Sequence, residues 1–344
     1  MEHRLSFSCD YLEGAHPAIL QRLCETNFAQ TAGYGTDEYC ESAREKIRAA
    51  CGAPNAEIHF LVGGTQTNAT VIDALLRSYE GVIAADTGHI NCHEAGAIEF
   101  GGHKVLTLPQ ENGKITASQI CALLDQYEDD ANRDHTVMPG MVYLSQPTEN
   151  GTLYSLSELD DLWQTCQDCG LFLYVDGARL GYGVMADGAD LTLPEIAHLC
   201  DVFYIGGTKV GALFGEAVVI MNPALKKDFR FIMKQRGGRM AKGRLLGIQF
   251  DVLFTDDLYT RISRNAIETA DRLKEGLAAK GYRFYMESPT NQVFVVLENT
   301  QLAALEGKAK FGFWEKFDDR HTVVRIATSW ATKMEEIEQL IALM

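Results

Sequence analysis

Several features are missing from this 344-residue sequence, and each absence excludes a class of protein. No apolar stretch approaches the ~18 residues that a membrane-spanning helix needs, so we expect no membrane partner. The first residues contain no apolar segment of the kind found in secretory signals. Positive charge is scarce, since 31 Lys and Arg face 47 Asp and Glu. The resulting net charge of −16 argues against nucleic acid and anionic membrane surfaces as partners.

The sequence also lacks an even, clustered set of cysteines. Its nine cysteines are scattered, which is typical of a reducing compartment, and we expect a cytoplasmic protein. Cys166 and Cys169 have a C-x-x-C spacing, but no second pair of this kind follows, and we interpret them as helix residues that touch the core. His89 and His93 could mimic a metal site at i, i+4 spacing, but we expect no metal there.

Two nucleotide-binding motifs are missing from the glycine-rich segment 62–68. It has no Gly-Lys-Ser/Thr ending and no three-glycine dinucleotide spacing. The segment does follow an expected strand and open an expected helix, and free N–H groups at a helix N-terminus can bind an anion. A single phosphate is therefore the better interpretation, while a tight turn without a ligand remains the alternative.

The order of the expected elements predicts an α/β fold. Helices and apolar strands alternate as far as about residue 245, and seven candidate strands lie in this part. After this point the order of expected elements changes, to a long amphipathic helix followed by a few strands and a last helix. We expect a large domain over residues 1–245, with an N-terminal arm at 1–15, and a small α/β domain over 246–344.

Two strands 33 residues apart carry the most informative residues. Asp176 ends the apolar run 171–175, and Lys209 follows the run 202–205. Strands that are apolar on both faces belong in a buried parallel sheet, whose carboxyl ends hold ligands. This pair suits pyridoxal phosphate, because a lysine can form a Schiff base with the aldehyde and a carboxylate can keep the pyridine nitrogen protonated. A Rossmann-like sheet whose strand ends carry solvated charges is the alternative.

Two further side chains suit such a site. His89 follows a short strand, and its imidazole could lie against a pyridine ring or serve as a base. Arg325 lies inside the apolar strand 322–330 and needs an anion. A substrate carboxylate would provide one, and a structural ion pair is the alternative.

These motifs together resemble the threonine aldolase group of pyridoxal-phosphate enzymes, which are beta-eliminating lyases with an aspartate-aminotransferase-like fold. The resemblance covers nearly the whole chain, and its strongest motifs lie at 34–39, 63–68, 89–96, 175–179 and 207–211. It implies a mostly parallel seven-stranded sheet sandwiched by helices. It also implies a cytoplasmic homodimer or homotetramer with active sites at the subunit interface, and a small amino acid as substrate. The expected reaction is cleavage of a β-hydroxy-α-amino acid to glycine and an aldehyde.

The resemblance also assigns roles to individual residues. Lys209 would bind the cofactor covalently, Asp176 would pair with the pyridine nitrogen, and His89 would stack on the ring. The phosphate would be bound by Gly64, Thr65 and Thr208. Arg179 would reach the ring hydroxyl or the substrate carboxylate, which Arg325 would hold. The basic run 226–244, with eight Lys and Arg against one acid, would border the cofactor phosphate, often that of a neighbouring subunit. Lys234 in this run matches a family lysine, and Lys234 and Cys9 would help to bind the substrate.

The chain departs from the family at three positions. Glu149 stands where a histidine usually contacts the β-hydroxyl, Cys9 replaces a serine, and Ala241 replaces an arginine. Glu149 could therefore be the base for the hydroxyl proton, with His89 or His93 competing, or only a turn residue. A β-eliminating lyase on the same scaffold remains the nearest rival function, and a non-catalytic cofactor-binding protein is the more distant one.

Overall fold

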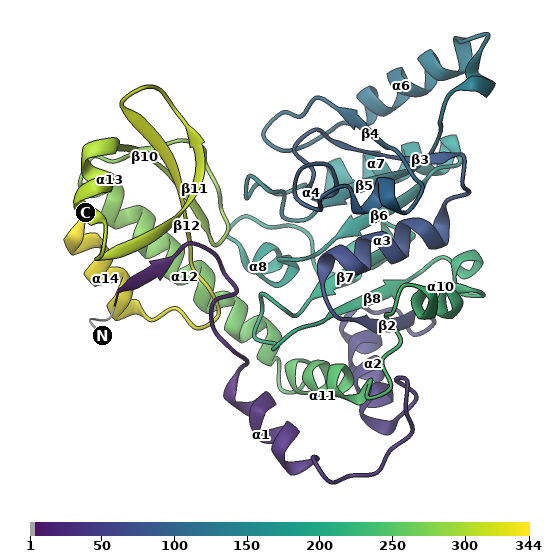
Figure 1. Ribbon diagram of the computed structural model, residues 1–344, viewed down its shortest axis with the longest axis horizontal. Coiled ribbons are helices and arrows are strands. Elements are labelled where there is room, and N and C mark those ends of the chain that lie inside the picture. Colours follow the sequence, from purple (N-terminus) through teal and green to yellow (C-terminus); the bar gives the residue numbers. More distant parts are fainter. Residues whose placement is uncertain (1–3) are drawn as a thin grey trace.

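The computed structural model describes residues 4–344, which form two sheets covered by helices (Figure 1). Within this range, no helix combines the length and apolar character needed to cross a membrane. The larger sheet contains the seven strands expected from the sequence. In spatial order they are β2 (Glu57–Leu61), β8 (Glu216–Ile220), β7 (Val202–Gly206), β6 (Phe172–Asp176), β5 (Met138–Ser145), β3 (Glu80–Ala85) and β4 (Val105–Leu108).

One strand of this sheet runs against the others. β8 pairs antiparallel with both β2 and β7, whereas the other neighbours pair in parallel. The carboxyl ends of the parallel strands and the amino end of β8 therefore meet at one edge of the sheet. Register confirms this, because Gly206 at the end of β7 lies opposite Glu216 at the start of β8.

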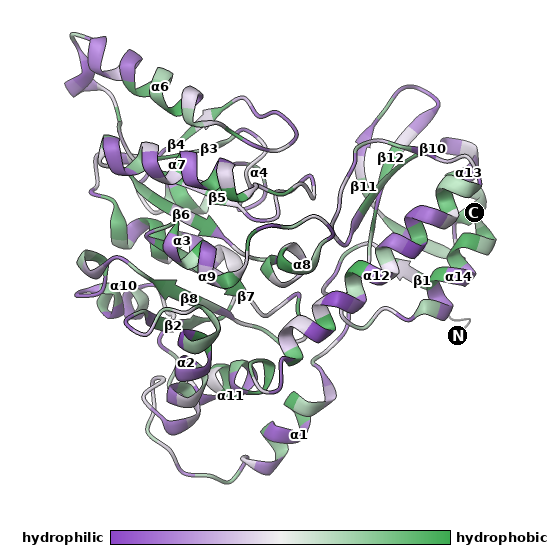
Figure 2. Cartoon of the chain, turned by 180° about the vertical axis from the view of Figure 1, so that it is seen from behind, coloured by the Kyte–Doolittle hydropathy of each residue, from purple (hydrophilic) through white to green (hydrophobic). Residues whose placement is uncertain are grey.

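Both faces of the large sheet are buried, which explains its continuous apolar strands. On β5, Val142 and Leu144 enter one hydrophobic core, while Met141 and Tyr143 enter the core on the other face. Figure 2 shows hydrophobic residues concentrated on central strands, with hydrophilic residues along helices such as α6 and α12. The first core is covered by helices that include α1 (Pro17–Glu25), α2 (Glu38–Ala50), α6 (Ala117–Asp129), α7 (Leu156–Cys169), α8 (Leu180–Met185), α9 (Leu193–His198) and α11 (Arg244–Leu253). The second core is covered by α3 (Gly64–Leu75), α4 (His89–Cys92), α5 (Ala97–Phe100) and α10 (Phe229–Gln235).

Side-chain caps fix the starts of several of these helices. The Asp37 side chain accepts a hydrogen bond from Cys40 N at 2.9 Å at the start of α2. Thr116 and Ser155 form capping boxes with Gln119 and Glu158 at the starts of α6 and α7. Each cap satisfies amides that a helix leaves without intrahelical partners. The capping residues therefore mark the positions where α2, α6 and α7 begin.

The smaller sheet is built mainly from the C-terminal part of the chain, and it also includes β1, the first strand of the described residues. Its strands, in spatial order, are β1 (Leu5–Phe7), β11 (Ala309–Lys316), β12 (His321–Ala327), β10 (Gln292–Glu298) and β9 (Arg283–Phe284). Helices α12 (Leu258–Ala279), α13 (Asn299–Leu305) and α14 (Met334–Leu343) contribute side chains to the core on one face. β1 pairs in parallel with β11, so the expected N-terminal arm adds a strand to this second sheet. The domain boundary near residue 245 remains a prediction.

Candidate active site

A cavity of about 290 Å³ lies at the edge of the large sheet where the strand ends meet. Eight of the eleven residues predicted for the site line it. They are Gly64, Thr65, His89, Glu149, Asp176, Arg179, Thr208 and Lys209. They come from segments far apart in the sequence, and the sheet brings them together because successive parallel strands end at the same edge.

Asp176 is the most extensively hydrogen-bonded of these residues. Its Oδ1 accepts from the Tyr204 hydroxyl at 2.5 Å and from Ala178 N at 3.0 Å. Its Oδ2 accepts from the Tyr143 hydroxyl at 2.7 Å and from Asn68 Nδ2 at 3.0 Å. These four donors satisfy both oxygens of the buried carboxylate and fix its orientation in the cavity wall.

A hydrogen-bonded chain joins His89 to this carboxylate. His89 Nδ1 lies 2.7 Å from Glu94 Oε1, and that oxygen also accepts from Asn68 Nδ2 at 2.7 Å. Burial alone would lower the pKa of His89, but the bond to Glu94 and the charge of Asp176 raise it above its usual value. Glu94 thus fixes the orientation of the imidazole. The His89 side chain lines the cavity and is 35% exposed.

Lys209 lies in the turn that follows β7, and its surroundings favour the neutral amine. Burial, reinforced by the charge of Arg179, lowers the pKa of Lys209, while Asp10, Asp176 and Glu216 oppose this effect. A neutral amine is the nucleophilic form that Schiff-base chemistry needs. The Tyr182 hydroxyl donates to Lys209 O at 2.5 Å and holds the turn in place.

The predicted phosphate-binding residues meet at the start of α3. No side chain caps this helix at Gly63, so its first amides are available to an anion. A Cβ at Gly64 would lie 3.2 Å from the Tyr204 hydroxyl, which shows how closely the backbone approaches the cavity wall. Gln66 connects this turn to the basic run 226–244, because its Nε2 donates to Arg236 O at 3.1 Å.

Arg179 lines the cavity but is engaged by another residue. Its Nε donates to Asp10 Oδ2 at 2.6 Å and its Nη2 to Asp10 Oδ1 at 2.9 Å. Asp10 also accepts from Asn291 Nδ2 at 2.9 Å, so it links the N-terminal segment, the large sheet and the residue that precedes β10 of the smaller sheet. The predicted contact of Arg179 with a ligand therefore depends on Nη1, which has no such bond among the described residues.

Arg325, Cys9 and Lys234 are the three predicted residues that do not line the cavity. Arg325 lies near Arg179 and Asp10. Burial and the charge of Arg179 lower the pKa of Arg325, and the charge of Asp10 opposes this effect. Arg325 donates to Gln292 Oε1 at 3.2 Å and to Ser8 O at 3.4 Å, and its buried Nε has no partner in the part of the chain that is described. This free donor fits the predicted anion.

Cys9 and Lys234 have different surroundings. Cys9 lies near Arg325 and near Tyr11, which does line the cavity. Lys234 lies on α10 with its Nζ 4.7 Å from the centre of the Tyr34 ring, and Arg239 lies over the same ring at 5.8 Å. Within the single chain, Lys234 therefore stands apart from the other predicted residues.

Glu149 faces the cavity from the turn after β5. Its Oε1 accepts from the Ser145 hydroxyl at 2.7 Å and from His89 N at 2.9 Å. Burial raises the pKa of Glu149 above its usual range, although the bond to Ser145 lowers it. A cavity-lining carboxyl with a raised pKa is a candidate for proton transfer.

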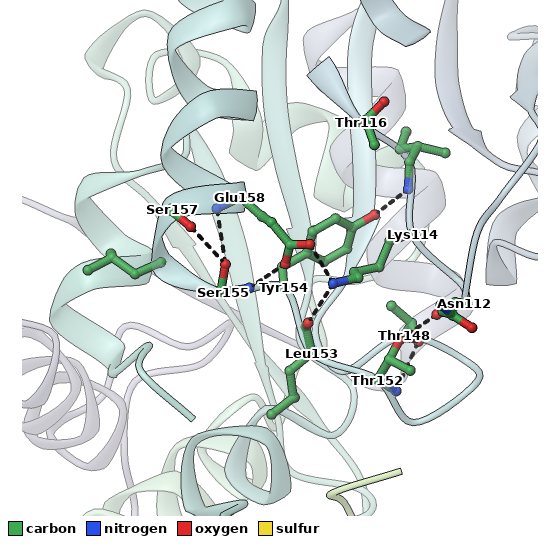
Figure 3. Close-up of polar contacts among 12 residues, drawn as sticks. Asn112, Lys114, Thr116, Thr148, Thr152, Leu153, Tyr154, Ser155, Ser157 and Glu158 are labelled. Atoms are coloured by element: carbon green, nitrogen blue, oxygen red, sulfur yellow. Dashed lines mark hydrogen bonds and ion pairs between the residues drawn. The ribbon is translucent and has the colours of Figure 1, made fainter. Parts of the chain in front are cut away.

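A second network holds the turn that carries Glu149 (Figure 3). The Thr148 and Thr152 hydroxyls lie 2.7 Å apart, and Thr152 donates to Asn112 O at 2.6 Å. The Tyr154 hydroxyl accepts from Ile115 N at 2.9 Å, and Lys114 Nζ donates to Leu153 O at 3.3 Å. These bonds fasten the turn to the segment before α6, so the position of Glu149 is set by more than its own two bonds.

Several residues of the site were not predicted from the sequence. They are Asp10, Tyr11, Asn68, Glu94, Tyr143, Ser145, Tyr204 and Glu216. Tyr143 and Tyr204 lie in buried strands, where they look like ordinary core residues. Glu216 had one usable signal, because it is a charged residue that opens an entirely apolar strand. The sequence does not reveal that this strand runs antiparallel and so begins at the ligand edge.

Comparisons with known proteins agree on one family. The family model described as beta-eliminating lyase matches residues 7–300. A low specificity L-threonine aldolase of Pseudomonas aeruginosa is 30% identical over 342 residues, covering 98% of this chain and 96% of that protein. A low specificity L-threonine aldolase of Escherichia coli K12 is 26% identical over 90% of this chain and 89% of its own length.

Solved structures give the same result. A threonine aldolase of Leishmania major is 44% identical with a TM-score of 0.96, and each chain covers 98% of the other. An aspartate aminotransferase of Thermus thermophilus, at 15% identity, has a TM-score of 0.70 over 99% of this chain and 90% of its own, which shows likeness of fold alone. The predicted aspartate-aminotransferase-like fold is therefore confirmed.

Proposed function

The chain belongs to the beta-eliminating lyase family, and on that premise we propose that it is a pyridoxal-phosphate-dependent carbon–carbon lyase. Its substrates would be β-hydroxy-α-amino acids such as threonine and allo-threonine, cleaved between Cα and Cβ to glycine and an aldehyde. The observation that carries the proposal is the meeting of Lys209, Asp176 and His89 in one cavity, beside the open N-terminus of α3.

The side chains present fit pyridoxal phosphate. A buried lysine with a lowered pKa suits covalent attachment of an aldehyde, and the buried carboxyl group of Asp176 suits a pyridine nitrogen as its partner. Gly64, Thr65 and Thr208 would hold the phosphate. Bound here, pyridoxal phosphate would supply the electron sink that accepts the electron pair left when the Cα–Cβ bond breaks.

The protein's own groups would then orient the substrate and move its protons. Arg325, with a buried Nε that has no partner in the described chain, would bind the substrate carboxylate. A fixed carboxylate fixes the rotation about the bond between the substrate's amino nitrogen and Cα. This rotation decides which of the other bonds at Cα breaks. Arg179 would support this site through Nη1, while Asp10 holds its other nitrogens.

Glu149 is our candidate for the base that takes the β-hydroxyl proton. It lines the cavity, and its raised pKa brings it nearer the range that a useful base needs. His89 and His93 compete for this role, with ring centroids 5.6 Å apart. The pKa of His93 is lowered by burial and by the charge of His89, so His93 would remain neutral and able to accept a proton.

We further propose a cytoplasmic homodimer or homotetramer with Lys234 and Cys9 near the ligands of a complete site. Large apolar side chains are uncovered in the single chain, including Phe28 (94% exposed) and Phe231 (75% exposed), the latter on the same helix as Lys234. Such residues are typical of surfaces that a second subunit covers. All nine cysteines are free thiols, which supports a reducing compartment.

Threonine itself separates the proposal from its rivals. Incubation of the pyridoxal-phosphate-loaded protein with threonine and allo-threonine should release glycine and acetaldehyde in equal amounts. β-Elimination would instead give 2-oxobutanoate and ammonia from the same substrates. Formation of these products would favour the rival lyase function, and no turnover of either kind would contradict the proposal.

A further inference from the structure

Glu216 is a buried carboxyl in the cavity wall to which none of the roles above is assigned. It opens β8, is 3% exposed, and lies beside the turn that carries Thr208 and Lys209. Its Oε1 accepts from the Thr208 hydroxyl at 2.8 Å, and its Oε2 accepts from Gly207 N at 3.1 Å. The carboxyl therefore touches directly a residue that would bind the cofactor phosphate.

The hydrogen bonds of Thr208 create a conflict with that role. A hydroxyl has one hydrogen and two lone pairs. Gly215 N donates to one lone pair at 3.0 Å, and an ionised Glu216 takes the hydrogen. Thr208 would then turn only a lone pair toward an incoming phosphate, which repels an anion. If Glu216 carries a proton, it can donate to Thr208, and the Thr208 hydrogen becomes free for the phosphate.

The surroundings of Glu216 make the protonated form accessible. Burial raises the pKa of Glu216 to about 8, against the lowering effects of the Thr208 bond and the Lys209 charge. Asp176 adds like charge, and β2 offers only apolar Leu61 opposite Glu216. The other titratable groups that interact with it are the buried tyrosines Tyr174, Tyr204 and Tyr259, all with raised pKa values.

We propose that Glu216 is a positioning residue that takes up a proton from solvent when the cofactor phosphate binds, so that Thr208 can donate to the phosphate. This inference rests on the proposed function, because it assumes a phosphate-bearing cofactor in this cavity. It adds a property that the proposed function does not require, namely that cofactor affinity falls as Glu216 loses its proton. A dianion placed beside Glu216 raises the cost of that ionisation further.

The test measures binding rather than turnover. The probe is pyridoxine 5′-phosphate, which has no aldehyde and cannot bond covalently to Lys209. Titration calorimetry of the full-length protein, freed of cofactor, in buffers of different ionisation heat gives both the Kd and the number of protons taken up. Between pH 7 and 9 a phosphate monoester stays dianionic, because its second pKa is about 6. Unphosphorylated pyridoxine serves as the ligand control.

The wild-type Kd for the phosphorylated probe should rise about tenfold between pH 7 and pH 9, with about half a proton taken up per site near pH 8. The Glu216→Gln variant, whose amide can donate to Thr208 at any pH, should show neither effect. As a matched control, Asp201→Asn changes a buried carboxyl with a raised pKa that precedes β7 at the opposite edge of the sheet, and it should keep the wild-type pH dependence.

Two results would overturn the inference: a wild-type Kd that does not change with pH and involves no proton uptake, or a Glu216→Gln variant with the wild-type slope. Pyridoxine carries the same ring nitrogen as the phosphorylated probe, so protons taken up by the ring are counted with both ligands. The number of protons that the wild type takes up with the phosphorylated probe in excess of the number taken up with pyridoxine decides the matter even if the Gln variant does not fold. Failure of the proposed function would be recognised separately, as loaded wild-type protein that does not cleave threonine.

Discussion

Asp10 and Arg179 form a buried ion pair in which two guanidinium nitrogens donate to the two carboxylate oxygens, at 2.6 and 2.9 Å. Neither side chain is more than 12% exposed. The pair connects the strand-end edge of the large sheet to the N-terminal segment, and through Asn291 to the start of β10 in the smaller sheet. It therefore contributes both to the position of Arg179 in the site and to the packing between the two sheets.

Replacing Asp10 with Asn should lower the free energy of unfolding by about 3–5 kcal/mol, because it leaves the charge of Arg179 buried without a partner. Burial raises the pKa of Asp10, but the charge of Arg179 and the hydrogen bonds that Asp10 accepts lower it by more. The pKa of Asp10 therefore lies below its ordinary value of 3.8. The stabilisation is therefore present above about pH 4 and is lost as the pH falls below it. Urea unfolding at several pH values measures this. Asp319→Asn, in an exposed pair with Lys316, should have almost no effect.

Lys209→Ala should abolish the yellow absorbance that pyridoxal phosphate acquires when it is bound to a lysine. No other amine lines the cavity in the described chain, so borohydride should trap no adduct. Lys234→Ala should retain the absorbance at saturating cofactor, because its amine lies against the Tyr34 ring. A trapped adduct in the Lys209 variant would show that another lysine is the attachment point.

Asp176→Asn should reduce kcat/KM on threonine by roughly a hundredfold, about 3 kcal/mol, because a neutral amide cannot hold the pyridine nitrogen protonated. Tyr204→Phe removes only one of four donors to this carboxylate, so we expect a loss of less than about tenfold. Steady-state kinetics of the two loaded variants provide the comparison. Near-normal turnover of Asp176→Asn would rule out the role given to this carboxylate.

Glu149 and His89 can be separated by their pH–rate profiles. Since burial raises the pKa of Glu149, the rate should rise with pH as this carboxyl ionises. Glu149→Gln should lose that rise together with most of the rate, whereas His89→Asn should keep the rise at a lower rate. Both variants are compared on threonine and allo-threonine. If the Gln variant keeps its rate and its preference between the two substrates, Glu149 is only a turn residue.

The sequence by itself determined the large sheet and the centre of the site. Strands buried on both faces must be apolar throughout, so the runs before Asp176 and before Lys209 could be recognised without a structure. Because parallel strands end at one edge, the two residues could also be placed together. Both inferences depend only on local pattern and on a general property of α/β sheets.

Only the tertiary structure decided which groups surround these residues. Tyr143 and Tyr204 alternate along buried strands like any core residue, and their hydroxyls reach Asp176 only because β5 and β7 flank β6. Asp10 meets Arg179 across 169 positions of sequence. Glu216 reaches Thr208 because β8 runs antiparallel to its neighbours. Strand order, strand direction and long-range ion pairs depend on contacts between distant segments, and local sequence patterns carry no record of such contacts.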